Sequence, residues 1–370
     1  MEINALNELR DQVRKADREM AALFTERMAA VAKIAQYKSE RGLPIEDKAQ
    51  EARVIADRGP LVEDPDLRSF YVEFLQHTMD VSKAWQHRLL EGQKTAYCGV
   101  PGAFAHIAAK KIFPDGQAVS FPSFEEAYRS VAEGRCDTAV LPLENSYAGE
   151  VGQVLDLMFS GPLHVNGVYD LGITQDLLGV PGAAMEDIRT VVSHPQAIAQ
   201  CRKYIEKHGF EIREASNTAV AAKEAAERKD PSVAVIASEE TAALYGLEIL
   251  DHDINESRVN TTRFAVFSRV ANTPPDTPDN KKGSTFILLF TVKDEVGGLA
   301  KAINIISAYN INMRVLRSRP MKDLAWHYYF YAEAEGNVTS ENGQRMVNAL
   351  KGACPMVKIA GQYTAGEIIL

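Results

Sequence analysis

The feature that constrains this chain most is a run of residues, 6–38, in which apolar side chains recur at helical spacing. No glycine or proline interrupts the run before Gly42 and Pro44, so it predicts one long helix. At 1.5 Å per residue that helix is about 50 Å long, more than a segment of about ninety residues covers by itself. We therefore expect a partner subunit to pack along it.

Two further helices are predicted before the pattern changes. One follows Asp47, and the other extends from about Asp66 to Leu90. Residues 1–92 are thus expected to form an all-α domain of three helices in an intertwined dimer.

From Lys94 onward, short β-rich runs alternate with helical stretches. Such alternation indicates βαβ units and a mostly parallel sheet. Residues 94–271 are long enough for one doubly wound sheet or for two α/β lobes with a cleft between them. The expected strands are residues 95–99, 138–142, 190–193, 233–237 and 263–268, with helices at 124–133 and 196–207.

A polar stretch rich in proline, residues 272–283, has no apolar side chain and is typical of a linker. The segment after it, residues 284–370, is predicted to contain the elements β, α, β, β, α and β in that order. Within about eighty residues this order is typical of a ferredoxin-like α+β module.

The length and charge of the chain narrow the class of protein. A chain of 370 residues exceeds the size that one hydrophobic core usually supports, so two or three domains are expected. A formal net charge of −9 disfavours nucleic acid and anionic membranes as partners, because both require a dense positive face. The N-terminal residues lack the apolar region of a secretory signal, so a cytoplasmic protein is expected. The four cysteines show no zinc-ligand spacing.

Charged side chains stand on the apolar face of the first predicted helix. Arg27 and Lys38 fall within the apolar stripe on a helical wheel, and Arg10 lies at its flank. Burying an unpaired charge costs several kcal/mol, so each cation must reach water, pair with a carboxylate, or await an anionic ligand. The carboxylates considered for such pairing are Glu51 and Asp47.

This arrangement resembles the all-helical chorismate mutases. The resemblance covers about residues 5–90 and rests on LRDQVRKAD, Glu26-Arg27, Tyr37-Lys38, Asp47, Glu51 and Ser82-x-x-x-Gln86; Gln50 departs from it, because the family often has arginine there. It implies rearrangement of the dianion chorismate to prephenate, which needs a held conformer and cations at the breaking ether oxygen. By this resemblance, Arg27 and Arg10 of the partner subunit bind the substrate carboxylates. Lys38 and Gln86 donate hydrogen bonds to the ether oxygen. Glu51 and the Asp47 backbone bind the substrate hydroxyl, and Ser82 adds a polar contact.

Four short motifs of the central segment fall at the ends of predicted strands, where a parallel sheet presents its ligand crevice. They are residues 99–106, 142–149, 193–196 and 260–264. Taken alone, the first three are explained by a turn, a helix N-cap and a surface histidine. The fourth places hydroxyls beside an arginine, a side chain suited to a carboxylate.

Together the motifs resemble prephenate dehydratase along residues 94–270, through Pro-Leu-Glu-Asn-Ser, Ser-His-Pro-Gln and Thr-Arg-Phe in this order. The resemblance implies two α/β lobes like those of a periplasmic binding protein, with the active site between them. It also implies that prephenate loses its ring carboxylate as CO2 and its hydroxyl as water, which calls for an acid. The residues implied are Thr262, Glu144 and His194 as acid or orienting groups, Arg263 near the pyruvyl carboxylate, and Asn145, Ser146 and Phe264 as substrate contacts.

The C-terminal segment resembles an ACT domain, a small-ligand regulatory unit. Residues 297–300 (Gly-Gly-Leu-Ala) and 317–320 (Arg-Ser-Arg-Pro) occupy the places of the family's two effector motifs. The resemblance implies L-phenylalanine as the effector, although Arg317 replaces a glutamate beside the expected pocket. The effector contacts it implies are Gly297, Gly298, Leu299, Ser318 and Arg319.

The expectation from the whole sequence is a bifunctional enzyme of phenylalanine biosynthesis that converts chorismate through prephenate to phenylpyruvate. No cofactor and no metal are expected, and the chain is expected to be a homodimer or a higher homo-oligomer. Two alternatives stay open: a dehydratase whose helical segment serves dimerisation alone, and a two-lobed metabolite sensor without turnover.

Overall fold

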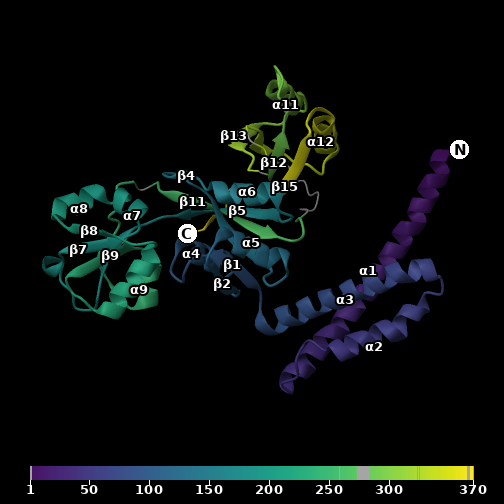
Figure 1. Ribbon diagram of the computed structural model, residues 1–370, viewed down its shortest axis with the longest axis horizontal. Coiled ribbons are helices and arrows are strands. Elements are labelled where there is room, and N and C mark those ends of the chain that lie inside the picture. The colour runs from purple at the N-terminus through teal and green to yellow at the C-terminus, as the bar shows by residue number, and fades with distance from the viewer. Residues whose placement is uncertain are drawn as a thin grey trace. The chain divides into compact units, whose positions relative to one another are not determined.

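The computed structural model describes residues 2–257, 259–272, 284–322, 324, 326–364 and 367–369. The chain forms two compact units, Met1–Gln93 and Lys94–Leu370 (Figure 1). The expected linker, apart from Asn272, lies outside the described residues. None of the helices in the described ranges is long and apolar enough to cross a membrane.

The first unit consists of helices, as predicted. Asp47 starts the second helix by accepting a hydrogen bond from the Gln50 amide at 2.9 Å, and Asp64 starts the third by accepting one from the Asp66 amide at 2.9 Å. The elements are α1 (Glu2–Glu40), α2 (Lys48–Arg58), a 3-10 turn (Gly59–Leu61) and α3 (Pro65–Glu91).

Much of the apolar stripe of the first unit is exposed in the single chain. On α1, the buried apolar side chains are Val31 and Ala35. The stripe otherwise faces outward at Leu6, Leu9, Val13, Met20, Leu23, Phe24 and Ile34 on α1, and at Leu67, Phe70, Phe74, Val81 and Leu89 on α3.

The second unit contains two separate sheets in its central segment, so the two-lobed alternative is the one that the structure shows. The chain crosses between the lobes after β5 and again before β11. The first lobe has β1 (Lys94–Cys98), β2 (Gln117–Phe121), β3 (Thr138–Asn145), β4 (Gly149–Glu150), β5 (His164–Gly172) and β11 (Thr261–Ser268), with α4 (Phe104–Ile112), α5 (Phe124–Ala132) and α6 (Gly152–Ser160). The second has β6 (Asp176–Gly179), β7 (Thr190–Ser193), β8 (Glu211–Glu214), β9 (Val233–Ala237) and β10 (Glu248–Asp251), with a 3-10 turn (Met185–Asp187), α7 (Pro195–Gln200), α8 (Arg202–His208), α9 (Thr218–Arg228) and α10 (Glu239–Tyr245) (Figure 1).

The sheets are more mixed than the sequence predicted. Strand β11 is antiparallel to both of its neighbours, β3 and β5, because it enters the first lobe directly from the second without a crossover helix. The strand expected at 138–142 continues to Asn145, and the helix expected at 196–207 is divided at Cys201. The strands of this segment that were not predicted are β2, β4, β5, β6, β8 and β10.

Residues 284–364 have the predicted order of elements, the additional strand β16 follows them, and the segment joins the sheet of the first lobe. Their four main strands lie in the order β13-β14-β12-β15, and β15 and β16 pair in parallel with β5. The hydrophobic core on one face is shared, since Leu289 and Tyr331 lie in one cluster with Leu141 and Met158. The elements are β12 (Ser284–Thr291), α11 (Gly298–Ala308), β13 (Met313–Pro320), β14 (Tyr328–Glu335), α12 (Glu341–Ala353), β15 (Met356–Thr364) and β16 (Glu367–Ile369).

Candidate active sites

In the helical unit, Arg27 of α1 faces α3, where its guanidinium donates a hydrogen bond to the Ser82 hydroxyl. Partial burial and the positive charge of Arg58 lower the pKa of Arg27. An anion placed beside these two arginines would therefore be stabilised.

The carboxylates considered as partners of the two cations are engaged elsewhere. Glu51 accepts from Lys83 of α3 at 3.1 Å, and Asp47 caps α2. Lys38 donates to the carbonyl oxygen of Ile45 at 2.7 Å. Within the described part of the chain, Arg27 and Lys38 thus form no ion pair with Glu51 or Asp47, so the pairing considered from the sequence is absent.

Gln86 is buried on α3, one turn after Ser82. Its Nε2 donates to the Ser82 carbonyl at 3.3 Å, while its Oε1 has no hydrogen-bond partner among the described residues. An unsatisfied buried polar atom costs about 1–3 kcal/mol, which is typical of a site that a polar ligand completes. Arg10 is exposed on α1, about 25 Å along the helix axis from Arg27, so the two arginines of one chain do not meet at one site.

In the two-lobed segment, the side chain of Asn145 joins three of the motifs. Its Nδ2 donates to the Thr262 hydroxyl at 2.8 Å and to Asn260 Oδ1 at 2.9 Å. Its Oδ1 accepts from the Tyr147 amide at 3.0 Å and from Gln196 Nε2 of α7 at 3.4 Å. Strand β3, strand β11 and the second lobe therefore meet at one amide.

His194 is the N-cap of α7, and its Nδ1 accepts a hydrogen bond from the Gln196 backbone amide at 3.2 Å. An accepting Nδ1 places the proton of a neutral imidazole on Nε2, so this histidine presents a donor on its other nitrogen. Ser146 is exposed, and its hydroxyl donates to the Val259 carbonyl at 3.1 Å and accepts from the Thr261 amide of β11 at 3.0 Å.

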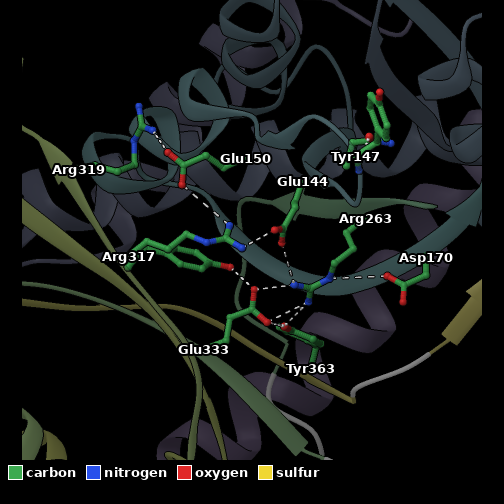
Figure 2. Close-up of polar contacts among 11 residues, drawn as sticks. Glu144, Tyr147, Glu150, Asp170, Arg263, Arg317, Arg319, Glu333 and Tyr363 are labelled. Atoms are coloured by element: carbon green, nitrogen blue, oxygen red, sulfur yellow. Dashed lines mark hydrogen bonds and ion pairs between the residues drawn. The ribbon is translucent and has the colours of Figure 1, made fainter. Parts of the chain in front are cut away.

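Arg263 and Glu144 belong to a dense group of charges (Figure 2). Both terminal nitrogens of Arg263 donate to Glu333 of β14, each at 2.9 Å, and the side chain also lies 3.8 Å from Glu144 and 3.7 Å from Asp170. Glu144 in turn accepts from Arg317 of β13. Both residues are thus held by side chains of the C-terminal segment.

Phe264 is 2% exposed and packs in the core against Tyr97 and Val140, on the α4 side of the sheet. The prediction that it contacts substrate is wrong, because its side chain, on the same face of β11 as Thr262 but two residues further along, is buried in this core.

The expected effector residues have mixed positions. Gly297 adopts a left-handed φ of 83° and precedes α11, and a Cβ on Gly298 would lie 2.4 Å from the Lys293 carbonyl oxygen, so local geometry calls for both glycines. Leu299 packs against the core beneath α11, and Ser318 is exposed on β13. Arg319 faces the first lobe, where it donates to Asp156 at 3.1 Å and to Glu150.

Several residues with clear roles escaped the sequence analysis as site residues. Asn260 and Gln196 stood inside recognised motifs, and their polar side chains were the available signal. Asn260 is 5% exposed, and its Nδ2 has no hydrogen-bond partner among the described residues. The sequence around Lys83 and Glu333 contains no motif that marks them as site residues, because only the fold brings them to Glu51 and Arg263.

Comparison with known proteins agrees with this geometry. The family model for prephenate dehydratase matches residues 95–272, and that for chorismate mutase type II matches residues 9–87. The bifunctional chorismate mutase/prephenate dehydratase of Aquifex aeolicus is 31% identical over 361 residues, covering 97% of each chain.

A solved structure described as GqqA, a novel type of quorum quenching acylases, has a TM-score of 0.68 at 30% identity, covering 74% of this chain and 98% of its own. The prephenate dehydratase of Arthrobacter aurescens in complex with L-Phe has a TM-score of 0.66 at 26% identity, covering 73% and 90%. The chain therefore belongs to the family of bifunctional chorismate mutase/prephenate dehydratases.

Proposed function

We propose that the helical unit converts chorismate to prephenate and that the two-lobed segment converts prephenate to phenylpyruvate. The observation that carries the proposal is the meeting of Thr262, Asn145 and the His194 helix at one place. Arg27 and Lys38 of α1, which form no ion pair among the described residues, support it. Residues 1–92 form the mutase domain, residues 94–271 the dehydratase domain, and residues 284–370 an ACT domain of ferredoxin-like fold.

In the mutase reaction the chain has to hold a dianion in its reactive conformer and stabilise charge on the ether oxygen. Arg27 and Arg10 of the partner subunit bind the carboxylates, and Lys38 and Gln86 donate to the ether oxygen. Glu51, the Asp47 backbone and Ser82 complete the contacts. Lys83 of α3 donates a hydrogen bond to Glu51 at 3.1 Å and so holds this carboxylate against α3.

In the dehydratase reaction the C–O bond to the ring hydroxyl breaks with a proton, the bond to the ring carboxylate breaks to release CO2, and the ring becomes aromatic. Thr262 is the proposed donor. Because its oxygen already accepts from Asn145, its own proton is free to point toward a substrate. His194 offers its Nε2–H as a second hydrogen-bond donor to the substrate. Glu144 is an orienting group, because it contacts Arg263 and accepts a hydrogen bond from Arg317. Asn145, Ser146 and Arg263 complete the proposed site.

We assign L-phenylalanine as the effector, bound near Gly297, Gly298, Leu299 and Ser318. The relative from Arthrobacter aurescens was solved with L-Phe, and α11 starts without a side-chain cap. Arg319 donates a hydrogen bond to Asp156 of the first lobe, so we assign it an indirect role in the response to the effector, through this contact. The exposed stripe of α1 supports a homodimer, since a second copy would cover it.

One assay tests the proposal as a whole. The purified chain is given chorismate, and prephenate and phenylpyruvate are followed together over time. We expect prephenate to appear first and phenylpyruvate after it. Formation of phenylpyruvate from supplied prephenate but not from chorismate would favour a helical unit that serves dimerisation alone, and binding of prephenate without turnover would favour a sensor.

A further inference from the structure

We propose that Glu333, on β14 of the C-terminal segment, is a positioning residue for the dehydratase site that acts through Arg263. The inference rests on the dehydratase function proposed above. It assigns to the C-terminal segment a constitutive part in that reaction, in addition to any effector binding.

The first observation is the geometry of the pair. Glu333 accepts from both terminal nitrogens of Arg263, at 2.9 Å each, in the two-point arrangement that fixes the plane of a guanidinium. Arg263 directly follows Thr262, the proposed proton donor, on β11, so the two side chains leave the strand on opposite faces, and Arg263 lies on the face of its register partner Glu144. The carboxylate therefore fixes the Arg263 guanidinium beside Glu144, and with it the segment of β11 that carries Thr262 (Figure 2).

The second observation is that Glu333 lies in a pocket built for a carboxylate. The residue is 4% exposed, and the hydroxyls of Tyr331 and Tyr363 donate to it in addition to Arg263. A buried carboxylate needs such partners, because it has lost its hydration. Burial alone would raise the pKa of Glu333, but the hydrogen bonds and charge of Arg263 outweigh it and lower that pKa.

The third observation is that the same segment holds the other charged residue of the site. Arg317 of β13 donates to Glu144, on the strand that pairs with β11. Two neighbouring strands of the C-terminal segment thus provide a carboxylate for Arg263 and a guanidinium for Glu144. The substitution of Arg317 for the family's glutamate is accounted for by this contact with the first lobe.

The fourth observation is that side chains of the C-terminal segment contact both ends of helix α6 in the first lobe. A Cβ on Gly152 would lie 2.4 Å from the Arg319 guanidinium, so the glycine at the start of α6 makes room for that side chain. At the other end of α6, the Lys358 ammonium donates to the Met158 carbonyl at 2.7 Å. Helix α6 follows the Asn145 loop and is therefore held at both ends by side chains from residues 284–364.

These contacts favour a positioning role over an inhibitory one. An inhibitory contact has to be released during each switch, whereas release here would leave Glu333 buried beside two tyrosines without its cation. The ion pair between Glu333 and Arg263 is therefore a permanent contact and not one that is broken during regulation.

The experiment compares Glu333→Gln with Glu335→Gln in the full-length chain. Glu335 lies on the same strand but pairs with Arg314 near the surface. We expect Glu333→Gln to lower dehydratase kcat/KM at least about tenfold, as expected for a displaced group in the site, and Glu335→Gln to stay within about twofold of the unchanged chain. Mutase activity, measured in the same samples, should be unchanged in both because it uses a separate unit.

A double-substitution cycle separates positioning from a general effect on the fold. If Glu333 acts through Arg263, adding Glu333→Gln to Arg263→Gln should lower dehydratase activity no further. A clear additional loss in the double variant, or full or increased activity in Glu333→Gln, would overturn the proposal.

Should Glu333→Gln not fold, Glu333→Asp retains the charge and shortens the reach by one methylene. We expect it to lose at least about fivefold in dehydratase activity, and full activity would again overturn the inference. If the unchanged chain itself fails to convert prephenate, it is the proposed function that fails, which this baseline measurement shows before any variant is compared.

Discussion

Asn145 donates a hydrogen bond of 2.8 Å to the Thr262 hydroxyl, linking strands β3 and β11 across 117 positions of sequence. The two residues are also register partners in the antiparallel pair. The orientation of the threonine is therefore set by a neighbouring strand, and the same amide reaches α7 of the second lobe through Gln196.

Thr262→Ala should lower dehydratase turnover at least about tenfold, because loss of a positioned proton donor is worth more than about 1.4 kcal/mol in the barrier. Thr262→Ser retains the hydroxyl and should keep more activity. The rate of phenylpyruvate formation from prephenate is the measurement. An alanine variant as active as the unchanged chain would show that the reaction centre lies elsewhere.

Arg27→Ala or Lys38→Ala should lower mutase activity at least about a hundredfold, the usual cost of removing a donor aimed at developing charge. Dehydratase activity on supplied prephenate should remain, since Arg27 and Lys38 belong to the helical unit. Lys33→Ala, an exposed cation on the same helix, serves as the control. Parallel loss of both activities in a folded variant would contradict two separate sites.

L-phenylalanine should lower dehydratase activity in the full-length chain. Gly298→Ala should weaken this response, since the added Cβ would lie 2.4 Å from a backbone oxygen of the loop before α11. Gly352→Ala on α12, where a Cβ meets nothing within 4 Å, is the matched control. Each variant is compared with its own rate without phenylalanine. A truncated chain is unsuitable here, because the two segments share a core.

If the glycine variant and its control respond equally, the effector does not bind at the start of α11. If the unchanged chain shows no response at all, the assignment of L-phenylalanine is wrong.

Acid should remove the stability difference between the unchanged chain and Glu333→Gln. The folded pKa of Glu333 is lowered, because Arg263 outweighs the effect of burial. Its contribution is therefore fully present above the unfolded glutamate pKa of about 4.3 and is lost as the pH falls through the folded value. Thermal unfolding of both proteins, measured from neutral pH downward, should show a constant gap that closes below about pH 4. A gap that widens in acid would contradict the ion pair.

Gly361→Ala should destabilise the second unit by at least about 2 kcal/mol, as overpacking against fixed backbone does. A Cβ there would lie 1.9 Å from the Val165 carbonyl oxygen, where β15 pairs with β5. Gly172→Ala on β5 has open space around it and is the control. Equal midpoints of unfolding for the two variants would mean that the β15–β5 contact adds nothing to stability.

Much of the site could be found from the sequence where the signal was local. The helical spacing of residues 6–38 and the cap at Asp47 predicted helices that the structure contains. The short motifs around Glu144, His194 and Thr262 were also recognised. In the structure, Asn145 contacts Thr262 and the His194 helix, and Arg263 contacts Glu144. Local patterns work because periodicity and capping depend on residues within one or two turns of each other.

Only the tertiary structure decided which partner each charged residue has. The sequence left one sheet or two lobes open, assigned Phe264 to the substrate, and placed Arg317 beside an effector pocket. The fold turns Phe264 into the core, brings Arg317 to Glu144, and brings Glu333 to Arg263 across 70 positions. Such contacts depend on strand order and register, which a single chain's local pattern does not encode, because every strand offers the same backbone hydrogen bonds to any neighbour.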